Sequence, residues 1–500
     1  MIIVFNPLLI RLLLRCVVSF AGLFLVGTSA WSNTTFGDVS FEQFVYHLRF
    51  GASGLLQTDA HTVHRFIVNA LELPLLAAVT LAVLSVIAEH RAYAASGPTG
   101  GSPGGSIRAL LQRGRPVTRR LHLLAVAGGL TFFLVTFSFG TYVSSFFGPD
   151  VFAANYLPPA QVTLTPVGKP KSLVIIYVES MESTYQDSTR FGRDLIAPLT
   201  RLQHRYASFD SYPQVSGAHW TIAGIVATQC GLPLKVSLLP SPEDASLHLR
   251  SYLPRATCLG DLLRARGYEN VFMNGPDLGF ADLGTFLKDH GYTRRYGARE
   301  WIQAGEDPHN MKEWGLRDDR LLAHARTELT QLVSTGRPFN LTILTVDTHG
   351  PDGLLSDTCK RRGVHDFSGI VTCTAQQVAE FVDFIADKGW LDRVSVVVQG
   401  DHIAMENPIH DTLETSPART VFNLIATDPV ETRLTDGFTH FDMFPTLLEL
   451  AGFHPDGGKL GLGYCMIKRC ETAPPPADRI RQFKEGLLNR SPVYEALWTG

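Results

Sequence analysis

Three long apolar segments near the N-terminus restrict what this chain can fold into. Residues 8–28, 66–88 and 121–140 carry few charged side chains, and each is close to the about 20 residues that a helix needs to cross a bilayer. They account for a mean hydropathy of +0.07, which is high for a soluble enzyme. We therefore predict a membrane anchor of three transmembrane helices within residues 1–160.

The basic residues predict how this anchor is oriented. Two arginines stand early in the first segment, and six more lie between the second and third segments. The intervening loop, residues 32–64, has only Arg49 as a fixed positive charge. Because cytoplasmic loops are enriched in Lys and Arg, everything after about Thr141 should lie outside. A cleaved signal peptide ending near residues 28–30 is an alternative for the first segment, and it leaves this assignment unchanged.

The cysteines suit an oxidising compartment. All of them except Cys16 lie in the predicted outer region, and an even number there favours disulfides. Their order along the chain favours the pairs Cys230–Cys258, Cys359–Cys373 and Cys465–Cys470, although other pairings are open. Zinc binding is a weaker alternative, because no two cysteines have the C-x-x-C spacing.

The organisation of the chain changes after the apolar segments. Residues 97–106 are rich in Gly, Ser and Pro, which is typical of a flexible loop, here cytoplasmic. From Lys171 onward, short β-rich runs alternate with helical stretches. The β-rich runs are residues 173–178, 271–273, 339–346, 394–399 and 421–426, and the helical stretches include residues 259–266, 321–333 and 375–387.

This alternation predicts an α/β fold with a mostly parallel sheet between helices. A boundary near residues 157–159, Leu-Pro-Pro, separates the anchor from an outer domain over residues 161–471. The tail, residues 472–500, begins with three prolines in close succession and is expected to be an extension rather than core.

Polar side chains follow three of the predicted strands. Glu179 follows the first, Asp347-Thr348-His349 another, and Asp401-His402 a third. Ligand sites of open α/β sheets lie beyond the carboxyl ends of the strands. A single carboxylate there is more often a helix cap, and a single His more often structural. Three such groups at one edge predict a functional site.

The net charge of −3 is too small to indicate a nucleic-acid partner, and the absence of a basic stripe with interleaved aromatics argues against one. An acidic substrate must therefore be bound by a local site or a metal. Glu179, Asp401 and His402 form a plausible mixed oxygen and nitrogen site for a divalent ion such as Mn²⁺ or Zn²⁺. Such an ion neutralises a phosphodiester and lowers the pKa of a coordinated hydroxyl.

The candidate nucleophile is Thr221, which small residues surround at the start of a probable helix. The free N–H groups and the dipole of a helix N-terminus favour an anionic oxygen. The alternative is that Thr221 is only the N-cap of that helix.

At these residues the sequence resembles the alkaline-phosphatase/sulfatase superfamily, in particular its lipoteichoic acid synthase-like branch. The resemblance covers about residues 171–462, and the first, third and fifth of the motifs below mark only the superfamily. The segments that carry it are YVESME (177–182), TIAGIVATQCGLPL (221–234), GDHIAM (400–405), TVDTHGPDG (345–353) and FDMFPTLLELAG (441–452). Of these, TIAG…QCG and DTH…PDG are typical of a glucan-modifying branch.

The resemblance implies a site for one divalent ion, with Mn²⁺ expected and Zn²⁺ or Mg²⁺ as alternatives. Its ligands would be Glu179, Thr221, Asp401 and His402, with Thr221 also the nucleophile. The residues expected to bind substrate are His349, Asp277 and Trp314. The chain departs from the family at two positions, because His219 stands where Gly is usual and Gly350 where a second His is frequent.

The resemblance also implies a two-step reaction at the bacterial inner membrane, with the outer domain in the periplasm. The threonine takes phosphoglycerol from phosphatidylglycerol, diacylglycerol leaves, and a periplasmic glucan accepts the group. Rival readings are a phosphoethanolamine transferase, a sulfatase, or an inactive membrane sensor or scaffold. The usual sulfatase motif, C/S-x-P-x-R, is not matched by the sequence after Cys230, and an inactive protein is expected to have lost at least one metal ligand.

Overall fold

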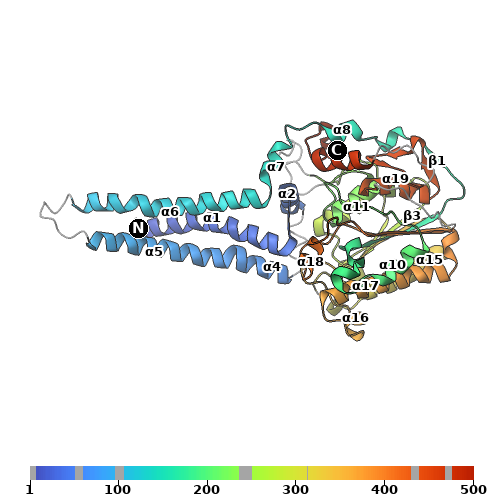
Figure 1. Cartoon of the computed structure of the whole chain (residues 1–500), viewed down its shortest axis with the longest axis horizontal. Helices are drawn as coiled ribbons and strands as arrows, with labels where there is room; N and C mark the ends of the chain where they lie inside the picture. The colour runs from blue at the N-terminus through green and yellow to red at the C-terminus, as the bar shows by residue number, and fades with distance from the viewer. Residues whose placement is uncertain are drawn as a thin grey trace. The chain divides into compact units, whose positions relative to one another are not determined.

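The computed structural model describes residues 7–50, 60–95, 106–235, 251–311, 313–428, 438–467 and 476–499, and these form two compact units (Figure 1). The first unit comprises the described parts of residues 1–41 and 60–142, and the second those of 42–59 and 143–500. Most of the predicted loop at residues 97–106 lies outside the described residues.

The first unit consists of long apolar helices. They are α1 (Pro7–Phe36), α4 (Ala60–Phe66), which continues through the π-helix η1 (Ile67–Glu72) into α5 (Leu73–Ala95), and α6 (Ser106–Thr136). Residues 10–36 and 61–89 are long and apolar enough to cross a membrane. The third predicted span ends four residues early, at Thr136, and the apolar stretch found in α6, residues 120–136, is shorter than the other two.

Polar side chains within these apolar helices pair with one another. Arg15 of α1 forms an ion pair with Glu89 of α5 at 2.6 Å, and the Ser19 hydroxyl lies 2.6 Å from Nδ1 of His122 in α6. Ionisable groups in apolar helices are costly unless they are paired in this way. These contacts therefore allow polar residues to interrupt the three apolar segments.

The second unit is built on one six-stranded sheet in the order β4-β3-β5-β2-β6-β7. All neighbouring strands are parallel except β6 and β7. The strands are β2 (Ser172–Val178), β3 (Glu269–Asn274), β4 (Arg294–Tyr296), β5 (Phe339–Leu344), β6 (Val394–Gly400) and β7 (Asn423–Ala426). The prediction of a mostly parallel α/β sheet is confirmed. Of the six strands of this sheet, the short edge strand β4, with the polar sequence Arg-Arg-Tyr, is the one that was not predicted.

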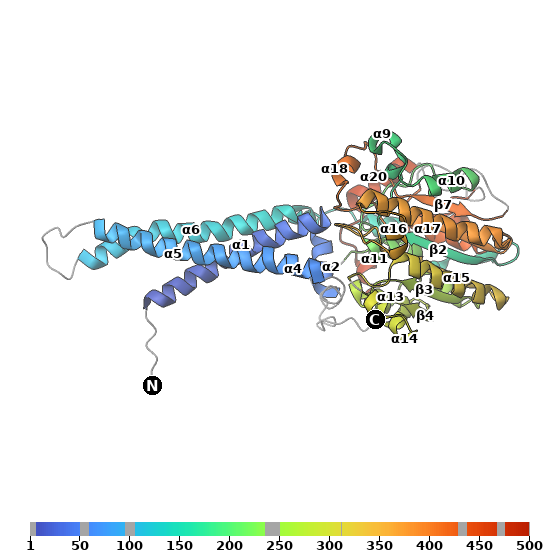
Figure 2. The same cartoon turned by 90° about the horizontal axis from the view of Figure 1, so that it is seen from below.

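Helices cover both faces of this sheet. The apolar core between the sheet and α10, α15 and α17 contains side chains from every one of these elements, and Figure 2 looks onto this layer. On the other face lie α11 and α19 (Figure 1). The main helices are α10 (Ala197–Arg205), α11 (Thr221–Cys230), α12 (Leu259–Arg264), α13 (Leu283–Asp289), α14 (Ala298–Gln303), α15 (Asp318–Ser334), α17 (Phe367–Asp387) and α19 (His440–Leu450).

Shorter elements complete the second unit. The short helices are α2 (Phe41–Phe50), α8 (Val151–Asn155), α9 (Ser188–Phe191), α16 (Asp357–Arg361), α18 (His410–Glu414), α20 (Pro476–Gly486) and α21 (Pro492–Glu495), while α7 (Phe139–Ser144) spans the boundary with the first unit. The small strand pairs are β1 (Leu164–Pro166) with β8 (Phe453–Pro455), and β9 (Lys459–Leu460) with β10 (Gly463–Tyr464).

Two of the three predicted disulfides are present. Cys230 at the end of α11 is bonded to Cys258 before α12, and Cys359 to Cys373. The third prediction, Cys465–Cys470, involves a cysteine outside the described residues. The first bond links the helix that begins with Thr221 to a neighbouring helix.

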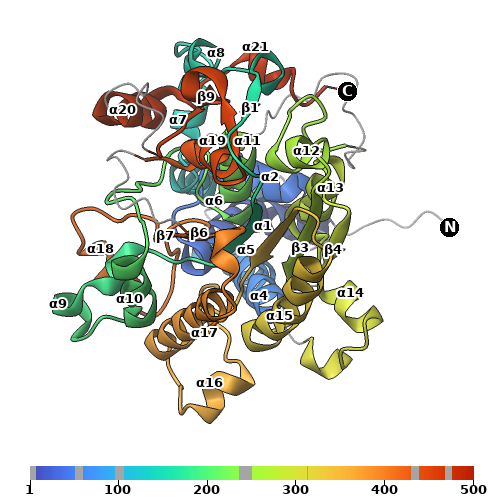
Figure 3. The ribbon, with the colours of Figure 1, turned by 90° about the vertical axis from the view of Figure 1, so that its right-hand side faces the viewer.

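The expectation that the C-terminal tail is a mere extension is wrong for its described part. Arg479 of α20 is buried and forms a two-pronged ion pair with Asp442 of α19, at 2.7 and 2.8 Å. Phe483 packs edge-on against Phe441. Figure 3 shows α20 beside α19. The prolines predicted an extension, but the last of them, Pro476, is the first residue of the helix α20.

This ion pair makes the tail a testable part of the fold. We expect Arg479→Ala to cost about 3–5 kcal/mol of unfolding free energy, because it leaves the buried carboxylate of Asp442 without its countercharge. Thermal and urea unfolding of the purified protein measure the loss. Arg481→Ala, which removes an exposed pair with Asp478, is the matched control and should have little effect. Equal stabilities of the two variants would contradict the role of the tail.

Candidate active site

Two neighbouring parallel strands bring the predicted metal ligands together. The ends of β2 and β6 lie in register, Val178 beside Gly400, so that Glu179 and the pair Asp401-His402 emerge side by side. Their ligand atoms all lie within 4.8 Å of one another, and all three residues are buried. His402 Nε2 is 3.5 Å from a Glu179 oxygen and 3.3 Å from Asp401 Oδ2.

The hydrogen bonds around these residues leave ligand atoms free for a cation. His402 Nδ1 lies 2.7 Å from the carbonyl oxygen of Ile403, so Nδ1 is the donor and Nε2 keeps its lone pair. Asp401 Oδ1 accepts from the N–H groups of Ser180 and His402. Among the described residues, neither Asp401 Oδ2 nor His402 Nε2 has a hydrogen-bond partner. Buried polar atoms without partners are rare, and this oxygen and nitrogen set fits a divalent ion.

The electrostatics of the cluster favour a cation as well. Burial and the charge of Glu179 raise the pKa of Asp401 to about 7. Burial lowers the pKa of His402, but the carboxylates of Asp401 and Glu179 outweigh it and raise that pKa above its ordinary value. The protein therefore holds two carboxylates close together away from water, where the charge of Glu179 disfavours the ionised form of Asp401.

Thr221 reaches this cluster from α11. Trp220 occupies the N-cap position and makes no side-chain capping bond, so the interpretation of Thr221 as a mere N-cap is wrong. Its hydroxyl instead donates to Glu179 Oε2 over 3.3 Å. A Cβ at Gly224, one turn later, would lie 2.1 Å from the carbonyl oxygen of Asp401. Only glycine allows the helix to approach the end of β6 this closely.

A buried ion pair supports the loop that carries Asp401 and His402. Glu182 is fully buried and accepts from the N–H of Ala404 at 3.0 Å. Arg419 donates to both oxygens of Glu182 and to the Ala404 carbonyl. The sequence analysis missed Arg419, because its partner lies 237 residues away and no local motif marks it.

Asp347, which was predicted at the same edge, is paired with Asp318. Its Oδ1 accepts from the N–H of Asp318 at 3.3 Å, and Asp318 in turn accepts from the N–H groups of Val346 and Asp347. Both carboxyls are buried. Burial raises the pKa of Asp318 to about 7 and that of Asp347 well above its ordinary value, the latter helped by the charge of Asp318. The pair is part of the support of the loop that ends in His349.

The three residues expected to bind substrate lie on neighbouring loops. His349 and Trp314 have ring centroids 4.1 Å apart. Trp314 also packs edge-on against Phe280 at 5.1 Å, and the N–H of Phe280 donates to the Asp277 carbonyl. The carboxylate of Asp277 is engaged by Arg299 at 2.6 Å and by the N–H of Gly279. The Asp277 carboxylate is therefore paired within the protein and stabilises this turn.

The two departures from the family have different surroundings. His219 is exposed. At Gly350 an added Cβ would lie 2.4 Å from the carbonyl oxygen of Glu406, so a histidine there would require the two loops to separate. The structure thus gives a steric reason for the second departure.

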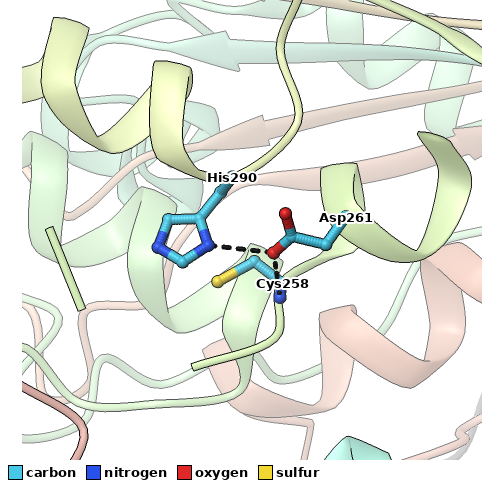
Figure 4. A group of neighbouring side chains, drawn as sticks. All are labelled: Cys258, Asp261 and His290. Carbon is cyan, nitrogen blue, oxygen red and sulfur yellow. Dashed lines mark hydrogen bonds and ion pairs between the residues drawn. The ribbon is translucent and has the colours of Figure 1, made fainter. Parts of the chain in front are cut away.

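Two other three-residue groups resemble metal sites but are less suited to the role. Figure 4 shows Cys258, Asp261 and His290 close together, yet the Cys258 sulfur is already bonded to Cys230. Asp261 instead accepts from the N–H of Cys258 at 2.9 Å and lies 2.9 Å from His290 Nδ1, as a helix cap does. The second group, Glu449, His454 and Cys465, contains a 2.9 Å contact between Glu449 and His454.

The raised pKa values of the aspartate pair predict a pH effect on stability. The folded protein keeps a proton on Asp318 or Asp347 that the unfolded chain releases above about pH 4. The free energy of unfolding of the protein therefore falls as the pH rises from about 4 to about 7. Asp347→Asn removes one of these acids. Between about pH 5 and about pH 8, the melting temperature of this variant should fall by less than that of the wild-type protein. Asp357→Asn, at an exposed position, is the control. Parallel pH curves for wild type and Asp347→Asn would rule out the coupling.

Comparisons with known proteins identify the family of this chain. A family model described as Sulfatase matches residues 171–453. Proteins named phosphoglycerol transferase I from Escherichia coli O127:H6 and Shigella boydii serotype 18 are each 37% identical over 359 residues, 70% of this chain and 45% of theirs. The chain thus spans about half the length of these curated relatives.

A solved structure shares the fold. The lipoteichoic acid synthase LtaP from Listeria monocytogenes superposes with a TM-score of 0.50 at 16% identity, over 70% of this chain and 95% of that one. The family match covers more than half of the chain and contains Glu179, Thr221, Asp401 and His402. The chain therefore belongs to the sulfatase family, with the alkaline-phosphatase-like fold of that superfamily.

Proposed function

We propose that this protein transfers phosphoglycerol from phosphatidylglycerol to a periplasmic glucan through a covalent intermediate on Thr221. One observation carries the proposal: the Thr221 hydroxyl lies 3.3 Å from Glu179, in a buried cluster in which Asp401 Oδ2 and His402 Nε2 have no hydrogen-bond partner among the described residues. The name of the 37% identical relatives, phosphoglycerol transferase I, supports the choice of transferred group.

We assign different roles to the residues of the cluster. Glu179, Thr221, Asp401 and His402 would hold one divalent ion, for which we propose Mn²⁺, with Zn²⁺ and Mg²⁺ as alternatives. When bound, such an ion neutralises phosphate charge and lowers the pKa of a coordinated hydroxyl. Glu179 Oε2 accepts the hydrogen bond of Thr221 and so orients its oxygen. The N-terminus of α11 favours negative charge on that oxygen.

The transfer then takes two steps. Thr221 Oγ1 forms a bond to phosphorus, the bond from phosphorus to the diacylglycerol oxygen breaks, and diacylglycerol leaves with the proton that Thr221 gives up. A glucan hydroxyl next forms a bond to the same phosphorus, the bond from phosphorus to Oγ1 breaks, and the proton of the glucan hydroxyl returns to Thr221. His349, Trp314 and the Asp277 turn would contact the headgroup, because their loops form one ring cluster.

The proposed location follows from the donor. A lipid donor requires the enzyme at a bilayer, and residues 10–36 and 61–89 form helices of suitable length and composition. We place the protein in the bacterial inner membrane with its catalytic unit in the periplasm. The arginine-rich sequence between the second and third apolar segments and the two disulfides support this orientation.

The nucleophile is tested by substitution. Thr221→Ala should lower phosphoglycerol transfer by at least about a thousandfold, while Thr221→Ser should keep part of it, because serine retains the oxygen and loses only the methyl group that restricts the rotamer. Mass spectrometry of acid-quenched enzyme with phosphatidylglycerol should find the phosphoglyceryl group on Thr221. Adduct on another residue, or an active Thr221→Ala protein, would refute the assignment.

The metal site is tested separately from activity. His402→Ala should weaken divalent-ion binding by at least about 100-fold, because it removes the Nε2 that has no protein partner. Metal content by elemental analysis and Mn²⁺ titration measure this. His309→Ala, at an exposed position, is the control and should bind as wild type does. Unchanged metal content in a folded His402→Ala protein would contradict the site.

A further inference from the structure

The helix α2 lies in sequence between the first two apolar segments. From Glu42 onward it nevertheless belongs to the second unit, which contains Thr221 and Glu179. Its buried side includes Val45 and Tyr46, and Tyr46 is fully buried. The Tyr46 hydroxyl donates to the carbonyl of Ala281 at 2.6 Å and lies 2.9 Å from the Tyr252 hydroxyl. Figure 3 shows α2 beside α13, which follows Ala281 in the chain. These bonds hold the next residue, His47, in a defined place.

His47 joins two parts of the candidate active site. Its ring lies 6.4 Å from that of Trp220, the residue before Thr221, and is stacked at 6.2 Å and 29° on Phe280. Phe280 packs on Trp314, and Trp314 on His349. A continuous row of rings therefore runs from the residue before the nucleophile to His349, and His47 is the link supplied by α2.

The chemistry of His47 suits a hydroxyl group. Its side chain is only partly buried, and within the described part of the chain it makes ring contacts but no hydrogen bond. Burial lowers its pKa to about 4, so the ring is neutral near pH 7. A neutral imidazole offers one donor and one acceptor, which match an alcohol. A phosphate oxygen, by contrast, is best bound by charge-assisted donors.

We propose that His47 is a specificity-determining residue that hydrogen-bonds a hydroxyl of the donor's glycerol headgroup while the phosphorus faces Thr221. This inference rests on the proposed function and deepens it. The rings of Trp220 and Phe280 pack against the carbon atoms of the headgroup, and His47 distinguishes a polyol from a headgroup without hydroxyls. A site built to bond a hydroxyl discriminates strongly against an analogue that lacks it.

The test compares two lipids with the full-length protein in mixed micelles. Diacylglycerol release is measured with phosphatidylglycerol and with phosphatidylethanol, whose headgroup has no hydroxyl. His47→Phe keeps a ring for stacking and loses both nitrogens. It should lower kcat/KM for phosphatidylglycerol by about tenfold or more and leave kcat/KM for phosphatidylethanol within about twofold. His365→Phe, at an exposed position, is the control and should change neither.

Further arms separate the explanations. His47→Asn keeps one donor and one acceptor and should retain part of the preference for phosphatidylglycerol. If His47→Phe unfolds at a lower temperature than the wild-type protein, the lipid preference of His47→Asn is the result that tests the inference. If kcat/KM falls equally for the two lipids in His47→Phe and in His47→Asn, His47 only supports the fold. If kcat/KM falls for neither lipid, His47 does not contact the headgroup. Each of these results overturns the inference. A wild-type protein that releases diacylglycerol from neither lipid overturns the proposed function and the inference with it.

Discussion

The contact between Gly224 and the carbonyl oxygen of Asp401 determines how the rest of the site is arranged. It presses the first turn of α11 against the end of β6, where any Cβ would collide. Thr221 is thereby kept within hydrogen-bonding reach of Glu179 on the adjacent strand. The far end of the same helix is tied down by the Cys230–Cys258 bond, so both ends of α11 are fixed by strong constraints.

Two buried glutamates that are three residues apart show how the protein distributes charge. Glu182 is neutralised within the fold by Arg419, which also binds the Ala404 carbonyl. Glu179 has no arginine or lysine partner among the described residues, and it lies beside His402 and the second carboxylate, that of Asp401. Burying a charge without compensation is costly. The fold therefore neutralises Glu182 with an internal ion pair and leaves Glu179 and Asp401 side by side, an arrangement that suits the proposed cation site.

The parts of the site that could be predicted from sequence are those governed by parallel-sheet geometry. Glu179, Asp401 and His402 directly follow strands that pair in register, and their convergence follows from that pairing. The orientation of Asp347 could not be predicted, since it depends on Asp318 at the start of a helix on another segment. The packing of Arg479 on Asp442 and the place of α2 likewise arise from contacts between residues far apart in sequence.

The position of α2 has a consequence for any soluble form of the protein. The second unit is discontinuous in sequence, because its described residues 42–50 precede the helices α4 to α6 and the remainder follows them. Proteolytic shedding after Tyr142 would release a fragment with Glu179, Thr221, Asp401 and His402 but without Tyr46 and His47. Such a fragment would lose the hydrogen bond between Tyr46 and Tyr252, and it would keep the contact between Thr221 and Glu179 while losing one link in the row of rings.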